Sequence, residues 1–367
     1  MKVLNLSIDT KILEKESDVA RRMIWFGDIV EKYTILIPFY KKQGCSLAKN
    51  VEVYGSGGKN KIVQFILLYI EAKKILKKEK YNLITTQDPF FIGLLGVFLA
   101  KKYKISLEAQ VHGWNAVGFV RKNVQKFVLK KASGIRVVSK RMMRKVINLG
   151  VEEPKINKVP VYVDIDSKNN IDNKKKIQGK FIFLSVSRLV AIKNIKMQIE
   201  AMRKLVGKCD CELWIVGEGN NKDNLIKLVK KYNLEKKVKF LGWRTGKELE
   251  DIYTQADCLL LTSYSEGWGR VVIEAGLYGV PTIMTDVGLA GEVVVDGENG
   301  IVIDVDDVNS LIDRMEYVIM NESFYDNISK NIMETVKNLP GRVDILDLYL
   351  EGWGRILRNF VILLYLK

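Results

Sequence analysis

The feature that most constrains the fold is an alternation of short apolar runs with amphipathic stretches, which begins at the N-terminus and starts again at residue 181. Runs of this length suit buried strands, the stretches between them suit helices, and their alternation predicts α/β layers on parallel sheets. In the first half we expect strands at 3–8, 34–37, 82–85, 105–111 and 135–138 and helices at 18–31, 61–79, 89–101, 119–131 and 139–148. In the second half we expect strands at 181–187, 212–216, 238–241, 257–261, 281–284 and 300–303 and helices at 194–206, 222–233, 247–254, 269–278 and 307–320.

A polar, lysine-rich stretch at 167–180 separates the two halves and has the composition of a linker. The chain of 367 residues is also longer than one hydrophobic core usually supports. We therefore predict two doubly wound, Rossmann-like domains that face a central cleft, where the carboxyl ends of their strands would bind ligands. The expected boundaries are 1–165 for the first domain, 166–180 for the linker, 181–340 for the second domain and 341–367 for a helical segment that could pack back on the first.

The net charge of +16 is unevenly distributed between the halves. Residues 1–180 contain 36 Lys and Arg against 16 Asp and Glu, whereas residues 181–367 contain 23 against 27. General lysine richness would affect both halves, so the asymmetry favours an anionic membrane surface or an acidic acceptor as a partner of the first half. Nucleic acid is the weaker alternative, because the basic segments lack the arginines and interleaved aromatic residues of a base-stacking surface.

Other features point to a cytoplasmic location. No apolar run reaches the roughly 18 residues of a membrane-spanning helix, and the N-terminus has no signal-peptide layout. Four scattered cysteines are too few for a disulfide scaffold, which favours a reducing compartment.

Several glycine and carboxylate patterns are weak by themselves. The segment Gly55–Lys59 lacks the spacing of a phosphate-binding loop, and Gly217–Gly219 lacks the third glycine of a dinucleotide fingerprint. Asp164 and Asp166 could hold a divalent metal, but they lie beside the linker. We expect neither a metal nor a resident cofactor.

The second half contains a more specific series. Arg188 and Lys193 follow its first strand, and cations at a strand's carboxyl end suit the phosphates of a nucleotide diphosphate. Further along, Glu266 precedes a glycine-flanked turn and Glu274 follows eight residues later on a predicted helix. The turn exposes backbone N–H groups at a helix start, and the carboxylates can accept hydrogen bonds from sugar and ribose hydroxyls.

The stretch 181–303 resembles the donor domain of retaining glycosyltransferases of family 4, which have the two-domain GT-B fold. The matching pieces are S-R-L…K-N at 187–194, W-I-V-G-E-G at 214–219, F-L-G at 240–242, E-x7-E at 266–274, G-V-P-T-I at 279–283, T-D-V-G at 285–288 and E-V-V-V-D-G-E-N-G at 292–300. Looser matches in the first half are T-T-Q-D-P at 85–89, V-H-G at 111–113, A-S-G-I-R-V-V-S at 132–139 and V-P-V-Y-V-D at 159–164. The resemblance covers nearly the whole chain.

The resemblance implies roles for particular residues. Arg188 and Lys193 would bind the donor diphosphate and stabilise the leaving group. Glu274 would bind the ribose hydroxyls. Glu266 would bind the transferred sugar together with the backbone N–H groups of the turn that follows Glu266. His112, the only histidine, would lie beside the sugar and orient the donor or the acceptor hydroxyl. The catalytic set is thus His112, Glu266, Arg188 and Lys193, and the donor-binding set is Gly217, Glu218, Leu241, Gly242, Gly267, Trp268, Gly269 and Glu274.

The chain departs from the family pattern after the first strand, where many members have a Gly-Gly pair. Here Ser17 and Asp18 are expected to cap a helix that carries Arg21 and Arg22 in its first turns. These arginines could replace the missing anion contacts, or they could lie on a solvated helix face. With Asp88 they form the acceptor-side candidates.

The sequence therefore predicts an enzyme that moves a sugar from a nucleotide-diphosphate sugar to a glycan or lipid-linked acceptor, with retention of configuration and without a metal. A growing polysaccharide or glycolipid at the cytoplasmic leaflet is the expected acceptor, with peripheral binding to the membrane. The alternatives are a GT-B-fold nucleotide-sugar epimerase or phosphorylase and, from another class, a basic nucleic-acid-binding protein.

Overall fold

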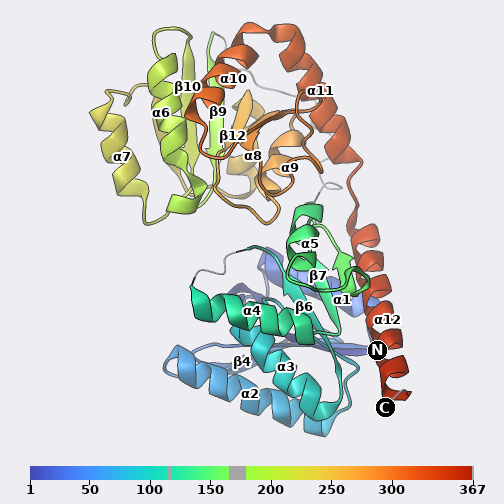
Figure 1. The fold of residues 1–367 in the computed structure, drawn as a ribbon. Coiled ribbons are helices and arrows are strands. Elements are labelled where there is room, and N and C mark those ends of the chain that lie inside the picture. The colour runs from blue at the N-terminus through green and yellow to red at the C-terminus, as the bar shows by residue number, and fades with distance from the viewer. Residues whose placement is uncertain (115–117, 165–178, 366–367) are drawn as a thin grey trace. The chain divides into compact units, whose positions relative to one another are not determined.

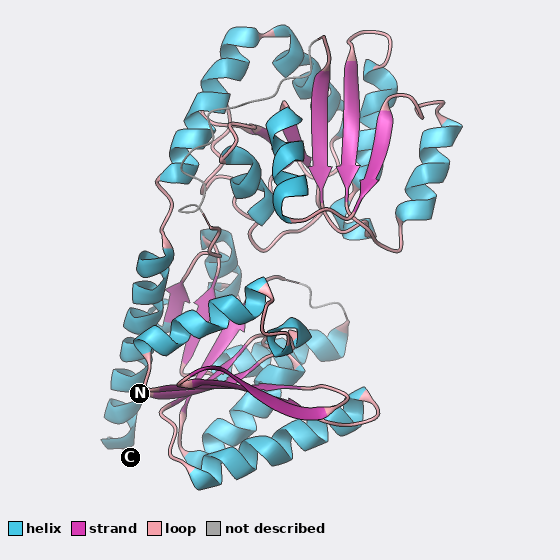
Figure 2. Cartoon of the chain, turned by 180° about the vertical axis from the view of Figure 1, so that it is seen from behind, coloured by secondary structure: helices cyan, strands magenta, loops and turns pink. Residues whose placement is uncertain are grey.

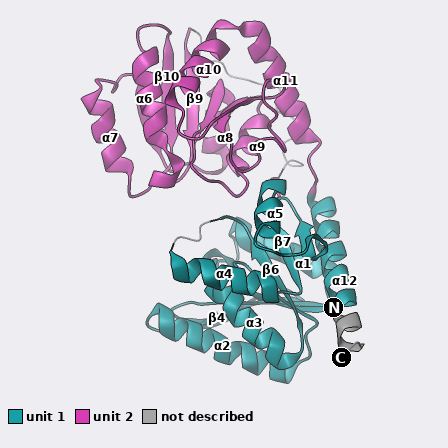
Figure 3. Ribbon diagram, in the orientation of Figure 1, with its two compact units in different colours: residues 1–160, 342–367 teal, residues 161–341 magenta. Residues whose placement is uncertain are grey.

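The computed structural model describes residues 1–114, 118–164 and 179–365, which form two compact units (Figure 3). Unit 1 contains Met1–Pro160 and Arg342–Lys367, and unit 2 contains Val161–Gly341. The predicted linker at 166–180 falls almost entirely on residues outside this description. Each unit has its own α/β sheet, as the alternation of strands and helices predicts (Figure 1).

The sheet of unit 1 has the strand order β3-β4-β2-β1-β5-β6-β7-β8 and is parallel except for β3, which runs antiparallel to β4. Its strands are β1 (Lys2–Leu6), β2 (Lys32–Ile37), β3 (Lys42–Ala48), β4 (Val51–Ser56), β5 (Leu83–Thr86), β6 (Ser106–Val111), β7 (Gly134–Val137) and β8 (Ile156–Lys158). Its helices are α1 (Asp18–Ile29), α2 (Lys61–Lys78), α3 (Phe91–Tyr103), α4 (Phe119–Lys131), α5 (Lys140–Ile147) and α12 (Arg342–Tyr365). As predicted, Ser17 caps α1, accepting a hydrogen bond from the Ala20 N–H at 3.1 Å.

The hairpin of β3 and β4 is absent from the sequence-based expectation. Strand β3 lies at the edge of the sheet and alternates exposed with half-buried residues, without an apolar run. Strand β4 ends in the glycine-rich segment Gly55–Lys59. An edge strand needs only one covered face, so it lacks the continuous hydrophobicity that identifies central strands.

The two faces of the unit 1 sheet differ in chemistry. One face packs an apolar core that includes Leu107, Ala109 and Val111 of β6 against residues from α2, α3, α4 and α5. Because side chains alternate along a strand, Glu108 and Gln110 of β6 point to the other face. Helices α1 and α12 lie on that side, where α12 contacts both α1 and β6. The second face therefore buries polar groups beneath the C-terminal helix.

Unit 2 has an all-parallel sheet with the strand order β11-β10-β9-β12-β13-β14. Its strands are β9 (Phe181–Val186), β10 (Cys211–Val216), β11 (Val238–Gly242), β12 (Cys258–Leu261), β13 (Thr282–Thr285) and β14 (Ile301–Ile303). Its helices are α6 (Ile195–Leu205), α7 (Lys222–Lys231), α8 (Gly246–Gln255), α9 (Arg270–Gly276), α10 (Val308–Met320) and α11 (Glu322–Lys337). Figure 2 shows the parallel strands of this unit ending along the same edge. The order reverses between β9 and β12, which is the switch point where doubly wound sheets bind ligands.

Within the described residues, every helix is too short or too polar to cross a membrane.

Candidate active site

Backbone contacts at the carboxyl ends of β9 and β10 leave room only for glycine. A Cβ atom added to Gly217 would lie 1.8 Å from the Ser187 carbonyl oxygen, and one added to Gly219 would lie 2.3 Å from that of Leu189. Gly217 also has a φ of +137°, which L side chains rarely adopt. Its N–H donates to the Gly242 carbonyl at 2.8 Å. The ends of β9, β10 and β11 are thus in direct backbone contact.

Lys193 is held at this edge by the turn that begins α6. Asn194 has a left-handed backbone with φ of +47°, and its Nδ2 donates to Asp306 Oδ1 at 3.0 Å. The Asn194 carbonyl accepts a hydrogen bond from Thr262 Oγ1 at 3.0 Å. These bonds fix the backbone next to Lys193, whose ammonium group forms a salt bridge with Glu266 Oε1. The structure therefore brings together two of the predicted catalytic residues.

Only one oxygen of the Glu266 carboxylate, Oε1, has partners among the described residues. Ser263 Oγ donates to Oε1 at 2.8 Å, the same oxygen that the Lys193 ammonium contacts. Among the described residues, no hydrogen bond to Oε2 is found. Because each carboxylate oxygen can accept two hydrogen bonds, Oε2 is available to a hydroxyl-bearing ligand.

The turn after Glu266 is packed tightly against a second glycine loop. A Cβ atom on Gly288 would lie 2.3 Å from the Trp268 carbonyl oxygen and 2.9 Å from Glu266 Cβ. The Leu289 N–H donates to that same Trp268 carbonyl at 3.0 Å, and the Trp268 side chain is buried. Gly269, with φ of +107°, precedes the first residue of α9. The predicted turn of Gly267, Trp268 and Gly269 is thus fixed by the loop that follows β13.

Arg188 and Glu218 lie on the exposed side of this edge. No carboxylate of the described residues forms an ion pair with Arg188. The Glu218 backbone carbonyl accepts from the Leu189 N–H at 2.9 Å, while its carboxylate pairs with Lys222 at 2.7 Å. The Arg188 guanidinium is therefore available to an anion, next to the backbone contact that joins β9 and β10. Leu241, the residue before Gly242, is partly exposed at the end of β11.

Glu274 is held on α9 by two donors. Tyr253 O–H donates to Oε2 at 3.1 Å, and Arg270 Nη2 donates to Oε1 at 3.1 Å. Burial, followed by the Glu274 charge, raises the pKa of Tyr253, so its phenol remains a neutral donor. Each Glu274 oxygen keeps a further acceptor position, which suits the two neighbouring hydroxyls of a ribose.

In unit 1, His112 follows β6 and both of its ring nitrogens have protein partners. Nε2 lies 2.9 Å from Gln110 Oε1, and Nδ1 lies 3.3 Å from Arg136 Nη2. Although the residue as a whole is exposed, desolvation of its imidazole lowers the pKa of His112 to about 3, and the charges of Arg136 and Arg22 add to this effect. The imidazole is therefore neutral at physiological pH.

The three acceptor-side candidates have different surroundings. The Arg22 charge acts on His112, whereas Arg21 donates to the Glu16 carbonyl at 2.8 Å and lies along the exposed start of α1. Asp88 accepts from the Phe90 N–H at 2.8 Å, and burial raises the pKa of its carboxyl group. Of the two arginines, Arg22 is the one that the structure relates to His112.

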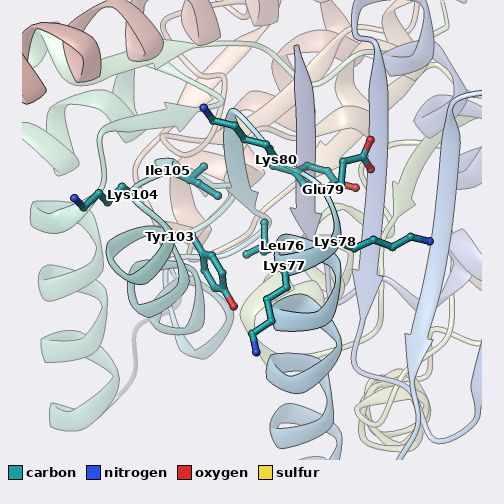
Figure 4. A pocket seen from close by; sticks show the side chains of 9 residues that line it. Leu76, Lys77, Lys78, Glu79, Lys80, Tyr103, Lys104 and Ile105 are labelled. Atoms are coloured by element: carbon teal, nitrogen blue, oxygen red, sulfur yellow. The ribbon is translucent and has the colours of Figure 1, made fainter.

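A surface hollow of about 230 Å³ lies elsewhere, at the amino ends of β5 and β6. Its lining residues are Leu76, Lys77, Lys78, Glu79, Lys80, Tyr81, Tyr103, Lys104 and Ile105. Figure 4 shows that the side chains of Lys78, Lys80 and Lys104 extend in different directions. These ammonium groups do not converge on a common point, so the hollow lacks the geometry of an anion site.

Several residues that orient the predicted ones are absent from the sequence-based expectation. Ser263 and Tyr253 support Glu266 and Glu274, while Gln110 and Arg136 support His112. The available signal is polarity inside expected strands, because Gln110 and Arg136 lie within the segments 105–111 and 135–138. The described residues contain no cluster of three or more His, Cys, Asp or Glu that could hold a metal. Asp166, half of the weak metal candidate, lies outside those residues.

Comparison with known families matches both parts of the chain. Residues 166–335 match the family of glycosyl transferases group 1, and residues 40–167 match glycosyltransferase family 4. The two matches meet near the boundary between units 1 and 2.

The chain is also similar to curated proteins. N-acetyl-alpha-D-glucosaminyl L-malate synthase of Bacillus anthracis is 26% identical over 65% of this chain and 63% of its own length. The lipopolysaccharide core biosynthesis glycosyltransferase LpsE of Rhizobium meliloti is 28% identical over 46% of this chain and 48% of its own. For UDP-Gal:alpha-D-GlcNAc-diphosphoundecaprenol alpha-1,3-galactosyltransferase of Escherichia coli, identity is 28% over 77% of this chain and 78% of that protein. The chain thus matches less than two thirds of the first two relatives.

Solved structures share the fold over nearly the whole chain. Alr3699/HepE of Anabaena, solved in complex with UDP, has a TM-score of 0.77 and 18% identity, covering 96% of this chain and 100% of that one. The lipopolysaccharide outer core galactosyltransferase WaaB, in its apo form, has a TM-score of 0.77 and 17% identity, covering 96% and 99%. At this identity the likeness shows the fold alone.

Proposed function

The chain is a glycosyltransferase of the family 4 kind with the GT-B fold, and on this premise we propose that it transfers a sugar from a nucleotide-diphosphate sugar to a lipid-linked or glycan acceptor, with retention of anomeric configuration. The observation that carries the proposal is the Lys193–Glu266 ion pair at the switch point of unit 2, with Arg188 exposed nearby in the chain. Here a cation lies beside a carboxylate that still has one oxygen available for hydrogen bonds. This pair suits a ligand in which a phosphate is joined to a sugar.

Each charged group has a role in the proposed reaction. Arg188 and Lys193 bind the diphosphate and offset the negative charge that develops as the bond from the anomeric carbon to the phosphate oxygen breaks. A new bond forms between that carbon and the acceptor oxygen, and the acceptor proton leaves with the released diphosphate. Glu266 holds sugar hydroxyls through Oε2, and Glu274 holds the ribose. Departure and attack on the same face retain the configuration without a covalent enzyme intermediate.

The nucleotide and the acceptor class are supported by the relatives. HepE was solved with UDP and with UDP-glucose, and the relatives from E. coli and Campylobacter jejuni are named for diphosphoundecaprenol acceptors. These names favour a uridine nucleotide and an acceptor on a polyprenyl diphosphate, in glycolipid or polysaccharide biosynthesis. We expect a cytoplasmic enzyme that works without a metal or a resident cofactor.

Nucleotide binding tests the donor part. Thermal-shift measurements with UDP-, GDP- and ADP-sugars should show stabilisation by one nucleotide class, in chelator-treated protein. Lys193→Ala should lose this stabilisation, because the diphosphate loses its cation. If no nucleotide sugar stabilises the wild-type protein at millimolar concentration, the donor assignment is wrong. The anomeric proton coupling of the product then distinguishes retention from inversion.

The outer surface of α2 and α4 supports peripheral membrane binding. On α2, Phe65 and Tyr69 pack against the core, whereas the isoleucines one turn apart at 62, 66 and 70 are exposed. On α4, Phe119 and Val120 are exposed beside basic residues. The exposed basic residues on these helices include Lys61, Arg121, Lys122, Lys126 and Lys130. Exposed apolar side chains among lysines suit the surface of an anionic bilayer.

Vesicle co-sedimentation tests the membrane part separately. The protein should bind vesicles with anionic lipid more tightly than neutral vesicles, and the double variant Ile62→Ser/Ile66→Ser should bind less. Met320→Ser is the matched control, because Met320 is an exposed apolar residue of unit 2. Equal binding to anionic and neutral vesicles would contradict the membrane proposal and leave the donor assignment intact.

A further inference from the structure

A row of polar side chains crosses the interior of unit 1, which is an unusual place for them. Thr85, Glu108, Gln110 and Arg136 are each at most 6% exposed, and they come from the adjacent strands β5, β6 and β7. Burial of charged groups costs free energy unless they are paired and hydrogen-bonded, so such a row requires an explanation beyond packing.

The row ends at His112 through a continuous chain of hydrogen bonds. Glu108 Oε2 accepts from Thr85 Oγ1 at 2.8 Å, and Thr85 Oγ1 accepts from Gln110 Nε2 at 2.9 Å. These contacts place the Gln110 amide nitrogen toward Thr85, so that Oε1 faces the His112 Nε2 at 2.9 Å. Gln110 is therefore oriented as an acceptor for the imidazole.

Arg136 contacts the other nitrogen of the same ring. Its Nη2 lies 3.3 Å from His112 Nδ1, and a guanidinium can only donate hydrogen bonds. Nδ1 must then carry a lone pair, and the ring proton must be on Nε2, where Gln110 accepts it. The pair of contacts selects one neutral tautomer of His112.

The C-terminal helix covers Arg136 on the face of the sheet to which the polar row points. The Arg136 guanidinium lies 4.9 Å from the centroid of the Tyr349 ring on α12. A Cβ atom on Gly134 would lie 2.3 Å from Ile356, and Asn157 Nδ2 donates to the Leu348 carbonyl at 3.0 Å. Helix α12 is thus in close contact with β7 and β8, and residues from the end of the chain shape the surroundings of His112.

We propose that Arg136 is a positioning residue for the transfer reaction, which holds His112 as the neutral Nε2–H tautomer, and that α12 contributes to the reaction by holding Arg136 in place. In this arrangement both nitrogens are engaged, so His112 is a fixed neutral contact for the sugar or the acceptor and not a proton carrier. The kinetic consequences rest on the proposed sugar transfer, whereas the state of the imidazole does not.

The charges around the ring agree with this assignment. The cations that face His112 are Arg136 from β7 and Arg22 from α1. Glu108 on β6 and Tyr33 on β2 face Arg136, whose pKa burial lowers to about 10, so the guanidinium remains charged at neutral pH. Burial raises the pKa of Tyr33, which keeps that phenol neutral. Two cations therefore oppose protonation of His112.

The single histidine makes the first test direct. In protein labelled with 15N-histidine, one set of ring signals is expected, with the chemical shifts of the Nε2–H tautomer and no titration between pH 5 and 8. A wild-type ring that titrates near 6.5, or that has its proton on Nδ1, would overturn the proposal whatever the enzyme's activity.

Variants then separate positioning from simple stabilisation. In Arg136→Gln, the pKa of His112 should rise, and kcat should fall roughly 10- to 100-fold with a smaller change in the KM for the nucleotide sugar. Arg136→Lys should restore the low pKa and part of kcat, because it keeps the charge. Arg355→Gln, which removes an exposed arginine from α12, is the control and should match the wild type. If Arg136→Gln lowers stability but leaves the tautomer, the pKa and kcat unchanged, Arg136 is only structural and the proposal is wrong.

Discussion

The two units present their candidate residues at the same structural position, the carboxyl ends of parallel strands, but they hold them in different ways. In unit 2 the candidate residues lie beside close backbone contacts between neighbouring strand ends, and these contacts require glycine. At Gly217, for example, the backbone of Ser187 leaves no space for a side chain. In unit 1 the support for His112 is a buried polar row whose members come from three adjacent strands, and Tyr349 of α12 packs on its Arg136.

This difference indicates separate tasks. A site for phosphates needs backbone that approaches the ligand closely, and glycine permits that approach. A site that holds one neutral imidazole needs fixed donors and acceptors on both nitrogens. Substitutions in unit 2 and in unit 1 should therefore have different effects on activity and stability.

The largest loss of activity is expected when Lys193 is replaced. Lys193→Ala should lower kcat roughly 100- to 1,000-fold, because a preorganised charge at the leaving group is worth about 3–4 kcal/mol in the transition state. Circular dichroism should show an unchanged fold. Lys196→Ala, which removes an exposed lysine from the next turn, is the control and should remain within a factor of about two. A Lys193→Ala enzyme with normal turnover would refute the site assignment in unit 2.

Glu274 should have the next largest effect. Glu274→Ala should lower kcat/KM roughly 10- to 100-fold, since a hydrogen bond to a charged group contributes about 1.5–3 kcal/mol. Tyr253→Phe removes only one of the donors to Glu274 and should have a smaller effect. The two variants are compared by steady-state kinetics with the donor that thermal shift identifies. Equal losses in both would place the role in Tyr253 and not in the carboxylate.

Two glycines of α12 test how unit 1 depends on the docking of that helix. A Cβ atom on Gly352 would lie 2.0 Å from Asn157 Nδ2, whereas one on Gly354 would have no neighbour closer than 3.6 Å. Gly352→Ala should lower the free energy of unfolding of unit 1 by about 1–3 kcal/mol through overpacking. Gly354→Ala should raise it by up to about 1 kcal/mol through helix propensity. Urea denaturation measures both, and two stabilised variants would contradict the close packing of α12 on β8.

The last comparison is the pH dependence of stability that comes from His112. Its pKa is about 3 in the folded chain and about 6.5 when unfolded, so the unfolded state binds more protons between these values. Stability should therefore fall as the pH drops below 6.5. His112→Asn should lose less stability than the wild type between pH 7 and pH 5, as measured by urea midpoints. An identical loss in both proteins would show that the imidazole titrates normally.

Much of the fold follows from local pattern. The strands and helices that the sequence predicts lie within a few residues of their expected positions, because most parallel strands are rich in apolar residues and their helices are amphipathic. Strands β3, β4 and β8 are not among the expected strands: β3 and β8 lie at the two edges of the sheet, and β4 ends in a glycine-rich segment. The short motifs around Arg188, Lys193, Glu266 and Glu274 can be recognised from the sequence. Each motif is contiguous and lies near the end of an expected strand.

The sequence by itself thus determined the two α/β units, the placement of the charge in the first half and the residues that line the strand ends of unit 2. Only the tertiary structure decided which of these residues touch: that Lys193 pairs with Glu266, 73 positions away, and that Ser263 shares the same oxygen. It also decided that Arg136 and Tyr349 lie behind His112. The physical reason is that periodicity reports which face of an element is buried, whereas hydrogen-bond partners on separate strands and helices are chosen by how those elements pack.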